Sequence, residues 1–432
     1  MFTSSEKRKA ILSIVFMYSF ILLFPAFGPV LNKLFSTNKS GIYSSIFLLF
    51  LSIGFLIPFG KVDKKMIHIY KIIIALLTIL IFNSSNLVII SFIFLGLIIA
   101  RCIVGWIYTY YYLYLDKNIS RFFGWILFFT YGILYIGNVI SPSLQKNLLL
   151  ILMLLFPVIS LIFSLNKSGL IYSVDSVYKN NNKSSYKKII IIILIVYIAA
   201  GTTYNGIYPR LMIYSLYERY YNVLPFLPGV LIAAYLNKKS SFILIYLGII
   251  FLGFSFISLF IPIGVGQYIL VQSNLQIAWA LLDFYAWYAG AKYAMHHNNP
   301  RLQVLFIASF LLGTTLGSFV NQYLSFNILD DFGFYHAVIT LLPLFVGLLI
   351  ASTFNLGDDE ERVNQSIKAY QFIKNDNLTK REKEITRLLL QDKTYSDICT
   401  ELSISINTLK THSKSIYRKL GVSNKSELSE YL

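Results

Sequence analysis

Four basic side chains near the C-terminus recur at spacings that place them on one side of a helix. They are Lys410, Lys414, Arg418 and Lys419. The apolar residues of the same stretch recur seven and four positions apart and predict a core-facing side; they are Leu409, Ile416 and Leu420. Ser405, just before the stretch, is a good N-cap because its hydroxyl can accept a hydrogen bond from a backbone N–H. Cations on an exposed helix face can bind phosphates or the acceptor atoms of nucleic-acid bases.

The residues before this stretch predict a second, shorter helix over Tyr395–Leu402. Four residues, Ser403 to Ile406, separate the two segments and predict a tight turn. A short helix, a turn and a basic second helix are typical of a helix-turn-helix, which places its second helix in the major groove of DNA. A basic face that is merely solvated is the alternative interpretation of the charges alone.

Residues 378–425 resemble the DNA-binding domain of the LuxR/GerE type, which favours DNA binding over a solvated face. The matching positions include Leu378-Thr379, Arg381-Glu382, Glu384-Ile385, Leu388, Ile398, Leu402, Ile404-Ser405, Thr408-Leu409-Lys410, His412, Ile416-Tyr417, Lys419 to Val422 and Leu428. Two positions depart from the family pattern: Asp392 stands where the family usually has Gly, and Cys399 where it usually has Ala. Asp tolerates a left-handed turn and Cys is small, so neither departure breaks the expected fold.

The resemblance implies a small four-helix domain over 378–432 that binds double-stranded promoter DNA. The residues expected to face the bases are Lys410, Thr411 and Lys414. The residues expected to position the phosphate backbone are Thr408, Arg418 and Lys419. The last helix, from Lys425 to Leu432, is where the resembling family dimerises, so we expect a homodimer on DNA.

The composition of the whole chain is far from that of a soluble globular protein. Hydrophobic residues make up 56%, charged residues 13%, and the mean hydropathy is +0.65. The net charge of +17 does not arise in the DNA-binding part, because residues 355–432 hold thirteen Lys and Arg against twelve Asp and Glu. The excess of positive charge lies in the apolar part, where membrane topology must explain it.

Apolar runs long enough to cross a bilayer, about 20 residues each, recur twelve times. The predicted spans are 11–31, 41–59, 66–82, 87–114, 122–140, 147–165, 188–208, 219–236, 242–262, 266–290, 302–322 and 334–354. If the N-terminus is cytoplasmic, the inner segments hold eighteen Lys and Arg, Lys71 among them, and the outer loops hold five. The positive-inside rule therefore predicts a bacterial cell-membrane protein with both termini in the cytoplasm.

Twelve spans divided by a polar loop at 166–187 resemble the major facilitator superfamily, which is built from two six-helix halves. Arg101 and Gly105 match its Arg-xxx-Gly pattern in the fourth helix. Residues 60–65 resemble its Gly/Asp/basic loop signature but are one residue short. The resemblance implies an all-α bundle, six helices plus six, and leaves transport activity open.

Ionisable or polar residues within the predicted spans are the candidates for a small-molecule site, because burying them in hydrocarbon is costly. The candidate ligand-binding residues are Arg101, Gln272, Gln276, Trp279 and Asp283. The last four are spaced by four, three and four positions, so they share one helix face. The alternative is a structural role in the bundle, which we favour for Arg101 and leave open for Asp283.

These expectations give three segments: a transmembrane domain over 1–354, a linker over 355–377 with a helix at 358–373, and the DNA-binding domain over 378–432. We find no nucleophile–base pair, phosphate-binding loop or metal-ligand spacing, and predict neither an enzyme nor a cofactor or metal. The predicted function is a membrane-embedded one-component transcriptional regulator that senses an unknown small molecule. One alternative is a major-facilitator-like secondary transporter with a regulatory tail; another is proteolytic release of the tail.

Overall fold

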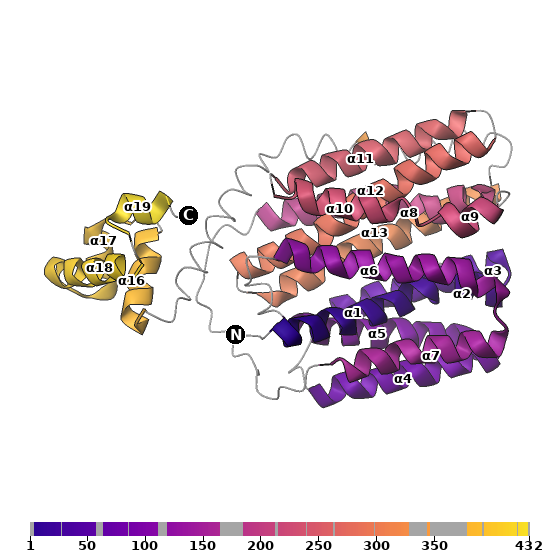
Figure 1. Ribbon diagram of the computed structural model, residues 1–432, viewed down its shortest axis with the longest axis horizontal. Coiled ribbons are helices and arrows are strands. Elements are labelled where there is room, and N and C mark those ends of the chain that lie inside the picture. The colour runs from indigo at the N-terminus through magenta and orange to yellow at the C-terminus, as the bar shows by residue number, and fades with distance from the viewer. Residues whose placement is uncertain are drawn as a thin grey trace. The chain divides into compact units, whose positions relative to one another are not determined.

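The structure is a computed structural model of the whole chain, and all regular structure among the residues that it describes is helical (Figure 1). The described residues are 4–26, 28–57, 64–84, 86–110, 119–164, 185–211, 215–238, 240–261, 264–297, 299–327, 344–345, 378–390, 393–420 and 422–430. The chain separates into two compact units, Met1–Leu356 and Gly357–Leu432.

The first unit is a bundle of apolar helices. Its helices are α1 Ser4–Leu23, α2 Pro29–Leu34, α3 Thr37–Leu56, α4 Lys64–Asn83, α5 Val88–Tyr110, α6 Ile119–Ile140, α7 Lys146–Ile162, α8 Ser185–Leu211, α9 Ser215–Tyr221, α10 Phe226–Leu236, α11 Phe242–Ile257, α12 Val265–His296 and α13 Pro300–Asn327, with 3-10 turns η2 Ser141–Ser143 and η4 Ser258–Phe260. Among the described residues, 6 helices are long and apolar enough to cross a membrane. The predicted all-α membrane bundle followed by a helix-turn-helix domain is confirmed.

Each predicted span from 11–31 to 302–322 coincides with a helix or a pair of helices. Two spans are divided at prolines, which cannot donate a backbone hydrogen bond within a helix. The span 219–236 becomes α9 and α10, with Pro225 as the N-cap of α10. The span 11–31 becomes α1, which ends at Leu23, and α2, which begins at Pro29. The linker helix predicted at 358–373 lies outside the described residues. Most of the predicted span 334–354 and most of the signature at 60–65 also lie outside them.

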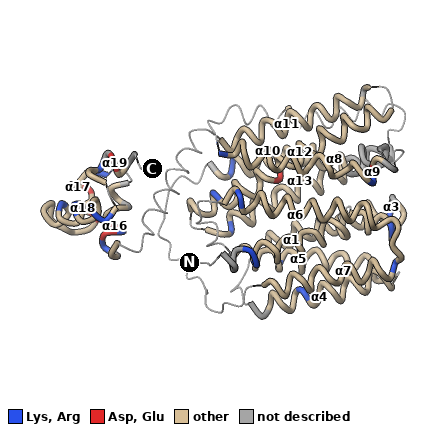
Figure 2. The backbone as a smooth tube through the Cα atoms, in the orientation of Figure 1, with Lys and Arg blue, Asp and Glu red and all other residues tan. Residues whose placement is uncertain are grey.

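The bundle consists of an N-terminal half, α1 to α7, and a C-terminal half, α8 to α13. The halves meet where α3 packs against α13 and where α6 packs against α10 and α12. Within the C-terminal half, glycines allow α8 and α13 to approach very closely, because a Cβ at Gly317 would overlap the backbone carbonyl of Ile198. Among the described residues, most Lys and Arg of the bundle lie toward the end of the bundle where α1 begins (Figure 2).

The second unit contains four helices around an apolar core: α16 Lys380–Leu390, α17 Tyr395–Leu402, α18 Ile406–Leu420 and α19 Lys425–Glu430. The core residues are Leu378, Ile385, Leu388, Leu389, Ile398, Leu409, Ile416, Val422 and Leu428. The turn between α17 and α18 is one residue shorter than predicted, because Ile406 already belongs to α18. Its first residue, Ser403, has a φ of 52° and ends α17 in the left-handed conformation.

Candidate functional site

The first candidate site is the exposed side of α18. Ser405 caps this helix as predicted, since the backbone N–H of Thr408 donates to its Oγ at 3.1 Å. The predicted core-facing residues Leu409 and Ile416 are fully buried, while Leu420 packs at the edge of the core. The helix is therefore fixed by its apolar side, and its opposite side is left for contacts with a partner.

The structure brings five of the six predicted DNA-facing residues to the surface of α18. The exposed residues are Thr408, Lys410, Thr411, Lys414 and Arg418. Lys419, the sixth, is held inside its own domain, because its Nζ donates to both carboxylate oxygens of Glu382 in α16 at 2.9 and 2.7 Å. The role of all six in binding DNA stays a prediction.

Glu382 is a buried carboxylate that joins α16 to α18. Besides Lys419, the hydroxyl of Ser415 donates to it at 2.7 Å and the backbone N–H of Thr379 at 2.8 Å. Burial alone would raise the pKa of Glu382, but the hydrogen bonds from Lys419, Thr379 and Ser415 outweigh it and lower the pKa to about 2. Glu382 therefore stays ionised and anchors the C-terminal end of α18.

Further contacts fix the short helix α17 in front of α18. Thr394 and Asp397 form a capping box at its start, in which each side chain accepts a hydrogen bond from the backbone N–H of the other. At its end, the guanidinium of Arg381 donates to the carbonyl oxygen of Leu402 at 2.7 Å. Both ends of α17 are thus capped, which holds the helix-turn-helix in one geometry.

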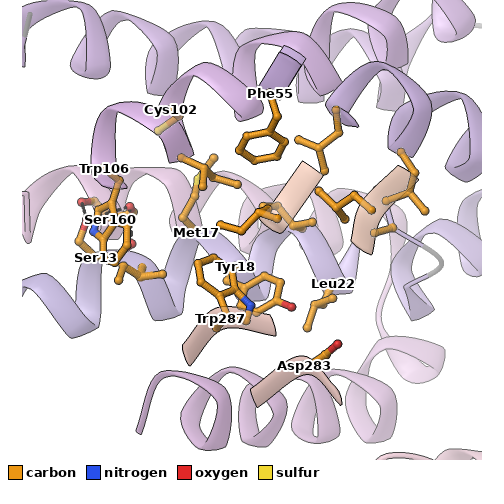
Figure 3. A pocket seen from close by; sticks show the side chains of 18 of the residues that line it. Ser13, Met17, Tyr18, Leu22, Phe55, Cys102, Trp106, Ser160, Asp283 and Trp287 are labelled. Carbon is orange, nitrogen blue, oxygen red and sulfur yellow. Dashed lines mark hydrogen bonds between the residues drawn. The ribbon is translucent and has the colours of Figure 1, made fainter. Parts of the chain in front are cut away.

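The second candidate site is a cavity of about 130 Å³ inside the first unit (Figure 3). Its walls come from α1, α3, α4, α5, α6 and α7 of the N-terminal half and from α12 and α13 of the C-terminal half. Most of the lining is apolar or aromatic; Tyr18 and Trp287 lie side by side in it, with ring centroids 5.9 Å apart. A cavity of this size has room for about ten water molecules.

Asp283 of α12 faces this cavity from the C-terminal half and is 4% exposed. Two tyrosine hydroxyls donate to its carboxylate: Tyr197 of α8 to Oδ1 at 2.7 Å, and Tyr131 of α6 to Oδ2 at 2.9 Å. Among the described residues, no cation lies within ion-pair distance of this carboxylate. Asp283 is thus an acid buried in the bundle whose described partners are neutral donors.

Lys71 of α4 faces the same cavity from the N-terminal half and is 5% exposed. Its Nζ donates to the carbonyl oxygen of Ser160, in the last turn of α7, at 2.8 Å and to the hydroxyl of Ser164, two residues after α7, at 2.6 Å. The hydroxyl of Ser13 in α1 is 3.5 Å away. In the described part of the chain no carboxylate pairs with Lys71.

The cavity includes two of the five predicted ligand-binding residues, Trp279 and Asp283, and not the other three. Gln272 and Gln276 are buried, but both amide groups donate to Asn222 in the connection between α9 and α10. Arg101 donates to the carbonyl oxygen of Ile57, the C-cap of α3, at 3.3 Å. These three side chains join elements of the bundle.

Sequence reasoning missed Lys71, because the positive-inside count treated it as a flanking residue of an inner loop. It lies seven positions after Lys64, the first residue of α4, which is about 10 Å further along the helix. That distance is the signal that could have identified it. The tyrosines that hold Asp283 were also missed, since the chain has 32 tyrosines and the sequence does not indicate which of them face α12.

Comparison with known proteins identifies the C-terminal domain. Residues 376–432 match the family described as bacterial regulatory proteins, luxR family. The spore germination protein GerE of Bacillus subtilis is 48% identical over 50 residues, which are 12% of this chain and 68% of that protein. The transcriptional regulatory protein LiaR of B. subtilis is 45% identical over 56 residues, 13% of this chain and 26% of LiaR. The regulatory protein SdiA of Escherichia coli is 42% identical over 55 residues, 13% of this chain and 23% of SdiA.

Solved structures resemble the membrane unit in fold. The human organic anion transporter MFSD10 (TETRAN) has a TM-score of 0.59 at 12% identity, over 80% of this chain and 100% of that one. A bacterial homologue of the iron transporter ferroportin, in an outward-facing state, has a TM-score of 0.54 at 13% identity, over 81% of this chain and 98% of that one. The membrane unit therefore shares its fold with these two transporters, in line with the resemblance to the major facilitator superfamily.

Proposed function

Because this chain belongs, through its C-terminal domain, to the luxR family of bacterial regulatory proteins, we propose that it regulates transcription while embedded in the membrane. The observation that carries the proposal is the pairing of two sites in one chain. One is a capped and anchored basic helix with an exposed face, and the other is a cavity in a membrane bundle that is lined by buried ionisable side chains. The first can bind DNA and the second can bind a small molecule.

In this proposal α18 enters the major groove of promoter DNA. Lys410, Thr411 and Lys414 lie in the first turns and contact base edges, while Thr408 and Arg418 contact phosphates. Lys419 fixes α18 against Glu382. Because that carboxylate pairs with the Lys419 ammonium, less of its charge is available to attract the phosphate backbone. One such domain covers little DNA, so specific binding requires two copies that pair through α19.

The membrane unit acts as the sensor in this proposal. A ligand in its cavity contacts helices of both halves, so it favours the arrangement of the halves that it fits best and shifts the population toward it. That shift changes how readily two cytoplasmic tails pair on DNA. The protein lies in the bacterial cell membrane in this proposal, and the charge distribution in Figure 2 supports a cytoplasmic N-terminus. The twelve spans predicted from the sequence would return the tail to the same side.

The experiment begins with selection of duplexes from a random library by the fragment 357–432. The full-length protein is then reconstituted in lipid nanodiscs and titrated with the selected duplex and with a scrambled one, at several salt concentrations. We expect the wild-type protein to prefer the selected duplex and the variant Lys410→Ala to change that preference. The matched control is Lys383→Ala in α16, which should behave like the wild type. Equal weak binding of both duplexes by wild type and Lys410→Ala would contradict the proposal.

A secondary transporter with a regulatory tail is the second candidate function. The observation that favours it is the match of the bundle to transporters over 80% of this chain, among them a human organic anion transporter. The discriminating experiment is uptake of labelled solutes by proteoliposomes that contain the full-length protein and carry an imposed proton gradient. Concentrative uptake would favour the transporter, whereas ligand binding without uptake favours the sensor.

A further inference from the structure

The cavity of the membrane unit holds two buried groups of opposite charge on opposite halves of the bundle. Lys71 is contributed by α4 in the N-terminal half and Asp283 by α12 in the C-terminal half. No ion pair joins them, and none of the described residues supplies a counter-ion to either. Placing an ionisable group in a membrane bundle is costly, and leaving it without a counter-ion adds to that cost.

The surroundings of Lys71 suit an amine that binds an anion. Its three described neighbours are a carbonyl oxygen and two hydroxyls, which orient the ammonium group without neutralising it. The ammonium carries three donors, and the contact of the third one, with the Ser13 hydroxyl at 3.5 Å, is much longer than the other two. Because Lys71 lines the cavity, a bound carboxylate would supply the missing charge and accept from the donor that makes this long contact.

The surroundings of Asp283 suit a carboxylate that binds a cation. The two tyrosine hydroxyls each occupy one of its oxygens, and an ionised carboxylate has about four acceptor positions. Acceptor positions therefore remain on a carboxylate that lines the cavity. Tyr18, Trp279 and Trp287 also line the cavity. Tyr18 and Trp287 lie near Asp283 (Figure 3), and aromatic rings would favour an ammonium group over water.

The remaining titratable side chains of the lining do not cancel either charge. They are Tyr18, His68, Cys102 and Tyr131. His68 lies on α4, one turn before Lys71, so it adds no negative charge to that end. The lining also includes the apolar side chains of Met17, Leu51 and Phe55, which would contact an apolar segment of a ligand.

From this arrangement we propose that the cavity binds a small zwitterion, with its carboxylate at Lys71, its ammonium at Asp283 and an apolar segment between them. Room for about ten water molecules corresponds to a ligand of roughly ten non-hydrogen atoms. Such a ligand joins the two halves through its two ends. The inference rests on the proposed function only in calling this ligand a signal, because the binding itself does not depend on DNA.

Binding can be measured with the intrinsic fluorescence of the full-length protein in nanodiscs. All four tryptophans belong to the membrane unit, and Trp106, Trp279 and Trp287 line the cavity. The probes are linear amino acids with two to seven methylenes between the amine and the carboxylate, together with leucine as an α-amino acid. For 6-aminohexanoate the matched single-charge analogues are 6-aminohexanamide, which keeps the cation, and the monoamide of adipic acid, which keeps the anion.

We expect at least one zwitterion to change the fluorescence saturably and to raise the unfolding temperature of the protein. Its two single-charge analogues should bind at least about tenfold more weakly, because each has lost a charge-assisted contact. Lys71→Met and Asp283→Asn should each weaken binding of the zwitterion by a similar factor. The matched control is Lys33→Met, since the amine of Lys33 donates to the carbonyl of Pro142 outside the cavity.

The comparison of analogues on wild-type protein needs no variant, so the proposal stays testable if Lys71→Met does not fold. Saturable binding of no zwitterion in the series would overturn it, and so would equal binding of the single-charge analogues. Zwitterion binding without any effect on DNA binding would support the ligand class and contradict the sensor. DNA binding in cells without binding of any zwitterion would overturn the ligand class and leave the proposed regulator standing.

Discussion

The contact between α16 and α18 makes a quantitative prediction about the stability of the DNA-binding unit. Glu382 is buried, and Lys419, Ser415 and the Thr379 backbone all donate to it. Glu382→Gln keeps the shape of the side chain and removes its charge. The amide then faces the ammonium of Lys419 with no compensating anion, so the domain should be destabilised.

The size of the effect follows from the pKa of Glu382. A pKa of about 2 in the folded state, against an ordinary value of 4.5, corresponds to about 3 kcal/mol of stability at neutral pH. The Gln side chain retains part of the hydrogen bonding, and the Lys419 side chain is 29% exposed to water. We therefore expect Glu382→Gln to lower the free energy of unfolding by about 2 kcal/mol at pH 7.

The contribution of Glu382 to the stability of the domain should decrease as the pH falls. Because the pKa of Glu382 is lowered by folding, its contribution is complete above about pH 4.5 and is lost as the pH falls toward 2. The difference between wild type and Glu382→Gln should therefore shrink over that window. Other carboxylates titrate in the same range, and taking the difference between the two proteins removes their contribution.

Urea unfolding of the fragment 357–432, followed by far-ultraviolet circular dichroism from pH 7 to pH 2, measures both quantities. The fragment contains a complete apolar core, so it is expected to fold alone. Lys419→Met and the double variant complete a thermodynamic cycle, in which we expect a coupling of about 1–2 kcal/mol. A Glu382→Gln variant within 0.5 kcal/mol of wild type at pH 7, or a difference that does not change with pH, would refute the reasoning.

Three further predictions concern other parts of the molecule. Lys410→Ala should change which duplex is preferred and cost about 1–3 kcal/mol on the best site, whereas Arg418→Ala should weaken all duplexes and reduce the salt dependence; titrations with selected and scrambled duplexes distinguish the two. Ser403→Gly should stabilise the fragment by up to about 1 kcal/mol in urea, because Gly adopts a φ of 52° without strain. Gly317→Ala should lower the unfolding temperature of the membrane unit, since its Cβ meets the Ile198 carbonyl; an unchanged temperature would mean that α8 and α13 can separate freely.

The sequence predicted the parts of this structure that depend on local patterns. Apolar length located the helices of the bundle, and the alternation of Leu409 and Ile416 with basic residues located α18 and its buried face. The division at Pro225 follows the same local chemistry, although the resulting break between α9 and α10 was not predicted.

The cavity could not be predicted in the same way, because it forms where distant segments meet. Asp283 was identified from the free-energy cost of burying a carboxyl group in the membrane. Its partners Tyr131 and Tyr197 could not be identified in this way, because they are 152 and 86 residues away in the chain. Helical periodicity grouped Gln272 with Asp283 correctly on a buried face. It could not show that Gln272 at one end of that face is covered by the connection near Asn222, whereas Asp283 at the other end lines a cavity.

Genome-wide DNA occupancy of the full-length, tagged protein in cells tests the central claim most directly. It is compared with the double variant Lys410→Ala/Lys414→Ala and with the control Lys383→Ala, each at the same level in the membrane fraction. We predict discrete peaks for wild type and control that disappear in the double variant. Membrane-localised protein with no peaks under any growth condition, or peaks that persist in the double variant, would contradict a regulator that binds promoters through α18.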